Sequence, residues 1–202
     1  SHLPDIPLKC FKAYDVRGRV PEELDEDIAR RIGQAYAEAI SPDRVVVGND
    51  VRLTSPKIKN GLIFGLREQG VSVLDIGQCG TEEVYFATQY LNLDGGIIVT
   101  ASHNPMNYNG MKFVREEARP ISGDSGLGKI RLLAEANGFS PAQVKGNLDE
   151  LDIAEEYVKC LLSYVDVSIL PQYRIVSNPG NGGAGRIIDY LEPQLPFEFI
   201  KI

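Results

Sequence analysis

The residues best suited to chemistry in this chain lie around one serine, between Thr100 and Lys112. Ser102 stands beside His103 in a segment that follows an apolar run, 96–100, which we expect to be a buried strand. A hydroxyl, an imidazole and an ammonium group therefore occur within one short stretch. Loops at the carboxyl ends of strands carry the chemistry of many α/β proteins. A serine in such a loop, near cationic groups and a divalent metal, is suited to carrying a phosphoryl group.

Further basic side chains, Lys12, Arg17 and Arg52, occur in short polar clusters at the edges of predicted loops or strands. Such clusters can surround a phosphate, because arginine binds oxygens with a planar fork and lysine acts as a point charge. The serine segment has a second interpretation as a turn whose polar side chains cap its own backbone. The residues by themselves leave both interpretations open.

Two glycine patterns suggest nucleotides but carry weaker evidence. Gly123–Lys129 has the spacing of a P-loop, yet Ile130 stands where a Ser or Thr must hold magnesium, so we expect a capped helix start. The Gly-Asp-Ser-Gly within it is also found at serine-protease nucleophiles, an interpretation that the α/β pattern disfavours. Gly180–Gly185 matches GxGxxG between a strand and a helix. Tight packing is the favoured interpretation, and a dinucleotide-dependent oxidoreductase is the alternative.

Composition limits the classes of function. The chain has 202 residues, 43% apolar and 24% charged, which permits one large domain or one domain and part of another. Its net charge of −7 argues against a general nucleic-acid binder. No apolar run approaches the roughly 20 residues that span a bilayer, and no secretory leader opens the chain. The three cysteines are far apart without zinc spacing, so we expect reduced thiols and a cytoplasmic location.

Strands and helices alternate along the chain, which predicts an α/β fold with a mixed, mostly parallel sheet sandwiched by helices. The expected helices are 24–40, 54–70, 81–91, 126–136, 153–164 and 186–191. The expected strands are 44–48, 71–76, 96–100, 111–114, 173–177 and 197–202, the fourth at an edge or antiparallel. The polar segment 140–150 is a candidate linker, and we expect a second α/β domain to begin after it. Because the last apolar run ends the chain, we expect a fragment of a longer protein.

Several motifs occur in the order typical of the α-D-phosphohexomutases. They are Phe11–Gly18, Gly48–Arg52, Thr100–Pro105 with Asn109–Lys112, and Gly180–Gly182. Over nearly its whole length the chain resembles the bacterial phosphomannomutase/phosphoglucomutase branch of that family. Phosphoglucosamine mutases are an alternative, although their first motif usually runs Phe-Gly-Thr-Asp-Gly, unlike the Phe-Lys-Ala-Tyr-Asp of this chain.

The resemblance implies a domain organisation and a reaction. Residues 3–150 would form the first of four domains, and residues 151–202 the beginning of the second. The full-length parent would be an isomerase that interconverts hexose 1-phosphate and hexose 6-phosphate. Ser102 would be phosphorylated and would donate its phosphoryl group to the sugar. The resulting hexose 1,6-bisphosphate would turn over within the cleft and return its other phosphate.

The resemblance also implies roles for single residues. Ser102, through its phosphate, would be a ligand of Mg²⁺, whose aspartate ligands would lie beyond this chain. Lys112 is the first candidate for general acid/base catalysis, and His103 is the second, unless it only orients the loop. Arg17 would clamp the transferred phosphate.

Binding of the sugar phosphate is assigned by the same resemblance to Tyr14, at the border of the substrate, and to Lys12. Asn49 stands where relatives often carry arginine, so no role is carried over to it. The loops that bind the metal, the sugar hydroxyls and the distal phosphate would lie beyond this chain, and we therefore expect the isolated chain to be inactive. A non-catalytic sugar-phosphate-binding relative is a further alternative.

Overall fold

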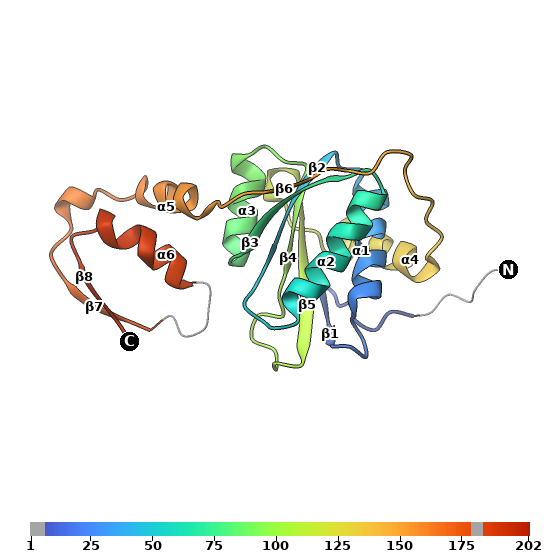
Figure 1. Cartoon of the computed structure of the whole chain (residues 1–202), viewed down its shortest axis with the longest axis horizontal. Coiled ribbons are helices and arrows are strands. Elements are labelled where there is room, and N and C mark those ends of the chain that lie inside the picture. The colour runs from blue at the N-terminus through green and yellow to red at the C-terminus, as the bar shows by residue number, and fades with distance from the viewer. Residues whose placement is uncertain (1–6, 179–183) are drawn as a thin grey trace.

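A six-stranded sheet forms the centre of the first of two bodies in the computed structural model, which describes residues 7–178 and 184–202 (Figure 1). The strands are Val16–Arg19 (β1), Arg44–Asn49 (β2), Ser72–Gln78 (β3), Gly95–Val99 (β4), Tyr108–Arg115 (β5) and Leu148–Glu150 (β6). Their order is β1-β5-β4-β2-β3-β6. The pairings among β4, β2, β3 and β6 are parallel, and β5 is antiparallel to both β4 and β1. The predicted mixed, mostly parallel α/β sheet is confirmed.

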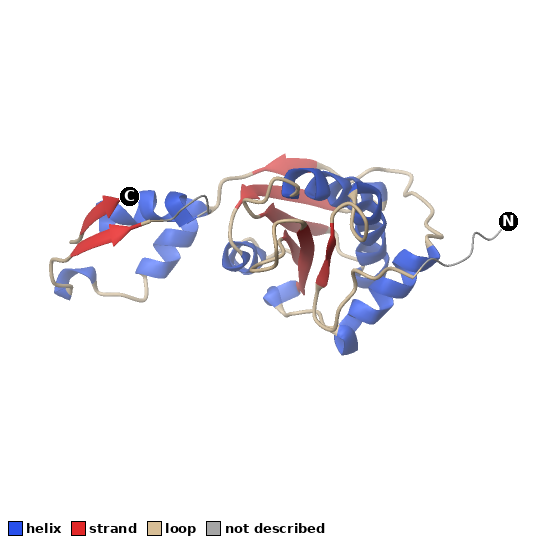
Figure 2. Cartoon of the chain, turned by 90° about the horizontal axis from the view of Figure 1, so that it is seen from below, coloured by secondary structure: helices blue, strands red, loops and turns tan. Residues whose placement is uncertain are grey.

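Helices cover both faces of this sheet, as the view in Figure 2 shows. One face carries Glu26–Ile40 (α1), Ser55–Glu68 (α2) and Gly128–Ala136 (α4), and the other carries Thr81–Tyr90 (α3). Residues of β2 alternate between the faces: Val45 and Val47 pack with α1 and α2, whereas Val46 packs against α3. Two short helical turns, Glu116–Ala118 and Gly123–Leu127, complete the first body. The β-branched run of β2 thus reflects burial on both sides.

Glycines allow the backbones of α1 and α2 to approach closely. A Cβ atom on Gly65 would lie 2.0 Å from the carbonyl oxygen of Arg30, and one on Gly61 would lie 2.2 Å from that of Glu26. The side chain of Asp25 caps α1 by accepting a hydrogen bond of 2.7 Å from the amide of Ile28. The closely packed helices α1 and α2 lie against the face of the sheet that Val45 and Val47 of β2 contribute to.

The second body follows Glu150 and lies beside α3 (Figure 1). Its elements are Ala154–Leu162 (α5), Val167–Ile169 (a 3₁₀ turn), Arg174–Ser177 (β7), Ala184–Leu191 (α6), Glu192–Gln194 (a 3₁₀ turn) and Glu198–Lys201 (β8). Strands β7 and β8 pair in parallel as a separate sheet. The ring of Tyr157 in α5 lies 5.5 Å from that of Phe86 in α3. Within the described ranges, no helix is long and apolar enough to cross a membrane.

The prediction of a linker over 140–150 was wrong at its end, because Leu148–Glu150 pairs with β3 as an edge strand. All three residues are exposed, so the pairing rests on backbone hydrogen bonds and leaves no apolar pattern. Strand β1 was not predicted. The motif Gly180–Gly182 lies outside the described residues.

Candidate active site

The carboxyl ends of β1, β2 and β4 lie beside the beginning of β5, at the same end of the sheet. The amide of Asp50 donates to the carbonyl of Val99, and that of Thr100 donates to the carbonyl of Gly110, both over 2.9 Å. Gly110 is in turn the register partner of Arg17 on β1. Asp50, Thr100, Gly110 and Arg17 therefore form one row across four strands. Ser102 follows two residues beyond this row.

The backbone of Ser102 is fixed while its side chain is exposed. Its φ angle is 52°, a left-handed conformation that costs a non-glycine residue roughly 1–2 kcal/mol. Its amide donates to Oγ1 of Thr100 over 3.0 Å, and its carbonyl accepts from Nη2 of Arg52 over 3.0 Å. Its hydroxyl has no hydrogen-bond partner within the described part of the chain. The oxygen is therefore presented to solvent from a backbone held at both peptide groups.

Hydrogen bonds within and beneath the loop hold the rest of it. The amide and the side-chain nitrogen of Asn104 both donate to the carbonyl of Ala101, over 3.0 and 2.8 Å. At the start of β5, the side-chain nitrogen of buried Asn109 donates to the hydroxyls of Thr54 and Ser55, over 2.9 Å each. The loop is thus tied to the N-terminus of α2 as well as to its own strands.

Lys112 and Arg17 lie on the same face of the sheet. Val16 and Met111 are register partners and are both fully buried in the core beneath α1 and α2. Since side chains alternate along a strand, Arg17 and Lys112 face the opposite side, which α3 covers farther along. Lys112 is half-buried and, within the described residues, makes no hydrogen bond or ion pair. The structure thus brings two of the predicted cations to the serine end of one sheet face.

The other predicted residues have different surroundings. His103 is exposed next to Ser102, and Tyr14 is 78% exposed. Arg17 is half-exposed, and its Nε donates to Asp15 over 3.0 Å. The ammonium of Lys12 donates to the carbonyl of Lys9 over 2.9 Å and borders a surface pocket formed with residues 123–131. No residue of the serine loop lines that pocket, so a role of Lys12 toward substrate stays a prediction.

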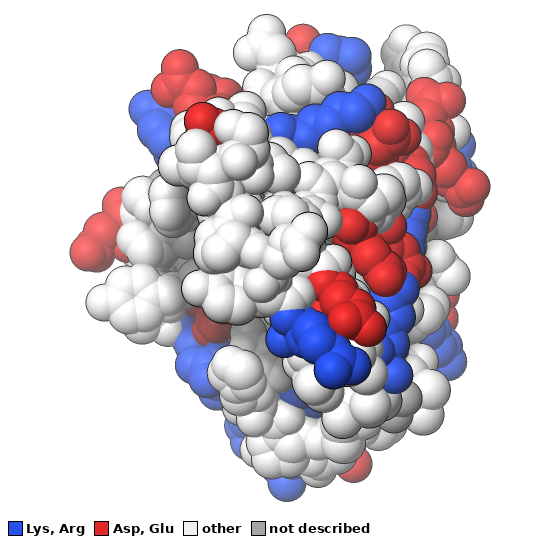
Figure 3. Space-filling model, turned by 90° about the vertical axis from the view of Figure 1, so that its left-hand side faces the viewer, with Lys and Arg blue, Asp and Glu red and all other residues white. Residues whose placement is uncertain are grey.

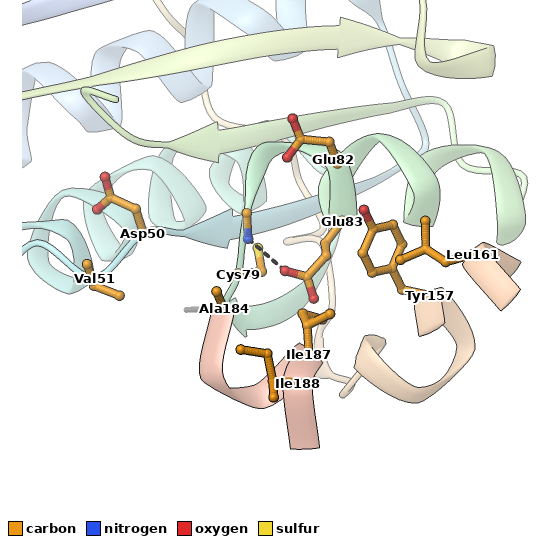
Figure 4. A pocket seen from close by; sticks show the side chains of 11 residues that line it. Asp50, Val51, Cys79, Glu82, Glu83, Tyr157, Leu161, Ala184, Ile187 and Ile188 are labelled. Atoms are coloured by element: carbon orange, nitrogen blue, oxygen red, sulfur yellow. Dashed lines mark hydrogen bonds between the residues drawn. The ribbon is translucent and has the colours of Figure 1, made fainter. Parts of the chain in front are cut away.

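A pocket of about 420 Å³ lies beside the row, between α3 and the helices α5 and α6 (Figure 4). Its lining residues are Asp50, Val51, Cys79, Gly80, Glu82, Glu83, Tyr157, Leu161, Ala184, Ile187 and Ile188. Among them are three carboxylates but no Lys or Arg, so this pocket is unsuited to a phosphate. Burial raises the pKa of Glu83 and that of the Cys79 thiol. The exposed Ser102 does not line this pocket.

The described residues provide no ligand set for the predicted metal ion. Within residues 7–178 and 184–202, no three His, Cys, Asp or Glu side chains gather as a metal site requires. Asp50, the carboxylate within the row, accepts hydrogen bonds from the amide of Arg52 and from the hydroxyl of Ser55. The predicted role of Ser102 as a metal ligand, through a phosphate, stays a prediction.

Comparison with known sequences gives a consistent set of similarities. The family model described as phosphoglucomutase/phosphomannomutase, alpha/beta/alpha domain I, matches residues 8–139. A phosphomannomutase of Salmonella typhimurium is 55% identical over 202 residues, which cover 96% of this chain and 44% of that protein. A protein of Xanthomonas campestris named phosphohexose mutases is 54% identical over 197 residues, which cover 98% of this chain and 44% of that protein. The chain thus spans less than half of the length of these curated relatives.

A solved structure extends the similarity to the fold. The crystal structure of a phosphoglucomutase/phosphomannomutase family protein from Burkholderia thailandensis matches with a TM-score of 0.85 and 33% identity. The match covers 98% of this chain and 44% of that one. The similarity therefore includes the second body as well as the six-stranded sheet.

Proposed function

Since the chain belongs to the phosphoglucomutase/phosphomannomutase family, we propose that it is the N-terminal part of a mutase that interconverts hexose 1-phosphate and hexose 6-phosphate. The proposed reaction passes through a phosphoserine at Ser102 and a hexose 1,6-bisphosphate. In this proposal residues 3–150 are the first domain, and residues 151–202 begin a second one. The remaining domains of the same protein are its partners in forming the site, and hexose phosphates are its substrates.

One observation carries the proposal: the hydroxyl of Ser102 is exposed and has no hydrogen-bond partner among the residues that the structure describes, on a loop whose backbone is held in place. A structural turn would be expected to use that hydroxyl for its own backbone, as the capping interpretation requires. Thr100 fills that role here, because its hydroxyl accepts from the amide of Ser102. The serine oxygen stays available for a reaction.

The chemistry follows from this placement. In the first half-reaction a sugar hydroxyl oxygen attacks the phosphorus of phosphorylated Ser102, and the bond from phosphorus to the serine oxygen breaks. The proton of the sugar hydroxyl passes to a base, for which Lys112 is the first candidate and His103 the second. In the second half-reaction the serine oxygen attacks the other phosphate of the bisphosphorylated sugar, and the proton returns to the departing sugar oxygen.

Charge neutralisation is the other requirement of phosphoryl transfer. Arg17 and Lys112 lie on one sheet face at the serine end, where positive charge would stabilise the phosphate oxygens. Tyr14 is exposed and available to border the sugar. Mg²⁺ would supply further Lewis-acid stabilisation, with Ser102 contributing through its phosphate. We also propose a cytoplasmic location, because the three cysteines are free thiols in the structure.

Intact-mass measurement tests the proposal directly. In a full-length protein that contains this chain, incubation with hexose 1,6-bisphosphate and magnesium should add the mass of one phosphoryl group. Peptide mapping should place that group on Ser102, and Ser102→Ala should abolish both the added mass and mutase turnover. Ser163→Ala, in the second body, serves as the control and should behave as wild type. A phosphoryl group that remains after Ser102→Ala would refute the proposal.

A further inference from the structure

The guanidinium of Arg52 lies beneath the serine loop and is 7% exposed. Its Nη1 donates to the carbonyls of Pro105 and Tyr108, over 2.6 and 3.0 Å. Its Nη2 donates to the carbonyls of Ser102 and Asn104, over 3.0 and 2.6 Å. One side chain from the loop after β2 therefore binds four backbone carbonyls of the serine loop.

These four carbonyls give the loop its shape. All four carbonyls accept hydrogen bonds from the buried guanidinium of Arg52. Without this donor, the carbonyls would lose the hydrogen bonds that compensate for their removal from water. Ser102 also holds a left-handed φ of 52°, which its surroundings must enforce because the residue is not glycine. The hydrogen bond from Arg52 to the carbonyl of Ser102 acts on the peptide group next to that angle.

Arg52 is itself held from three elements. Its Nε lies 3.5 Å from Oδ2 of Asp50, and its amide donates to Oδ1 of the same carboxylate over 3.0 Å. The hydroxyl of Ser55, at the start of α2, also donates to Asp50. Asn109 of β5 then donates to Ser55 over 2.9 Å. The end of β2, the start of α2 and the start of β5 thus fix one buried cation.

From these contacts we infer that Arg52 is a positioning residue, which sets the place and orientation of Ser102 through the loop backbone. This inference rests on the proposed function, in which Ser102 carries a phosphoryl group. In-line transfer depends on the position of the attacking and leaving oxygens, and a displacement of about 1 Å can cost roughly 100-fold in rate.

The donor count of Arg52 argues against direct binding of phosphate. A guanidinium has five N–H groups. Four of them point to loop carbonyls, and the fifth, on Nε, faces Asp50. The sequence had suggested Arg52 among the cations that surround a phosphate, but the structure leaves it no N–H group for one. Its effect on the reaction must pass through the loop.

Steady-state kinetics of a full-length mutase containing this chain test the inference. Arg52→Lys keeps the positive charge, but an ammonium has three donors on one atom and does not span four carbonyls. We expect kcat to fall about 100-fold while KM stays within about threefold. Arg31→Lys is the matched control, because Arg31 also donates to backbone carbonyls, those of Ala134 and Glu135, at a remote place. The control should keep its wild-type kcat.

Amide hydrogen exchange of the 202-residue chain gives a readout that does not need activity. Arg52→Lys should speed exchange at Ser102, Asn104 and Tyr108 by about tenfold or more and leave the amides of β4 unchanged. Should the variant not fold, nitrogen-15 spectra of the wild-type chain replace it. The Nη–H groups of Arg52 should then give separate, slowly exchanging signals. The Nη–H groups of exposed Arg44 should instead give one averaged signal.

The outcomes separate this inference from the proposed function. If Arg52→Lys speeds amide exchange in the loop but the full-length protein carries no phosphoserine, the proposed mutase function is refuted. The inference that Arg52 holds the loop backbone then still stands. A phosphorylated Ser102 combined with wild-type kcat in Arg52→Lys would overturn the inference. Averaged Arg52 signals in the wild-type chain would overturn it as well, and so would a rise in KM with kcat unchanged.

Discussion

At the scale of single residues, the proposed reaction has two candidates for transfer of the sugar hydroxyl proton, Lys112 and His103, and their surroundings differ. Lys112 is half-buried on β5, where pairing with Ile98 of β4 fixes its backbone. His103 is exposed in the loop and makes no hydrogen bond in the described part of the chain. A catalytic group on a strand is held more accurately than one on a loop. The placement therefore favours Lys112.

Kinetics of two variants in a full-length mutase distinguish them. Lys112→Met should lower kcat by about 10²–10⁴-fold, the usual contribution of a general acid/base. His103→Gln should lower kcat by less than about tenfold. A large loss of kcat in His103→Gln, with Lys112→Met near wild type, would reverse the assignment.

Sequence and structure contribute unequally at this scale. Ser102, His103 and Lys112 could be found because their side-chain types form a recognisable motif. The role of Arg52 could not be found, because its partners are main-chain carbonyls, which every residue type provides. The sequence therefore suggested a cation near phosphate, and only the fold shows that the cation binds the loop.

At the scale of elements, strongly patterned segments were predicted and weakly patterned ones were not. The apolar runs of β2 and β4 and the periodic face of α1 follow from burial. Strand β1 has four residues, and β6 is exposed throughout. They lie at the two edges of the sheet, where β1 contributes only Val16 to the apolar core and β6 contributes no side chain. Such edge strands leave little signal in a single sequence.

The first turn of α3 carries a buried carboxylate, Glu83, whose ionisation should make the stability of the fold depend on pH. Glu83 accepts a hydrogen bond of 2.7 Å from the amide of Gly80, the N-cap residue, and is 7% exposed. A carboxylate near a helix N-terminus is favoured by the helix dipole, yet burial outweighs this and raises the pKa of Glu83. Its contribution to stability is therefore full below pH 4.5, the ordinary pKa of the group, and is lost as pH rises through the folded-state pKa.

Glu83→Gln keeps an acceptor for the cap and removes the ionisation. Relative to wild type, the variant should gain unfolding free energy as pH rises from 4.5 through the folded-state pKa of Glu83. Urea unfolding of the chain across that range measures the difference. Glu82→Gln, at an exposed position in the same turn, should follow the wild-type pH dependence. A constant difference between Glu83→Gln and wild type would contradict the prediction.

At the scale of the molecule, the two bodies differ in how much they bury. The fully buried apolar residues lie in the six-stranded body and at one side of α5, whereas α6 buries none of its residues. Seen from the end that carries β7 and β8, charged residues of both signs surround a broad area without Lys, Arg, Asp or Glu (Figure 3). Exposed apolar side chains of this body include Tyr164, Ile169, Tyr173, Val176 and Ile202.

The isolated 202-residue chain should have negligible mutase turnover. The pocket beside the row is lined by carboxylates without Lys or Arg, and the described residues provide no metal-ligand cluster. We expect its rate with saturating hexose 1,6-bisphosphate and magnesium to be at least about 1,000-fold below that of the full-length protein, because in the proposed function the remaining domains take part in forming the site. Circular dichroism should verify folding, and normal turnover would show the prediction to be wrong.

The antiparallel pairing of β4 and β5 limits how the segment between them can diverge in evolution. A single-residue insertion in β5 would shift the register by one, turn Lys112 into the apolar core and push Met111 out of it. Residues added to the loop between the two strands would move the carbonyls of Ser102, Asn104 and Pro105 away from the guanidinium of Arg52. Both the stem and the loop therefore admit substitutions more readily than changes in length.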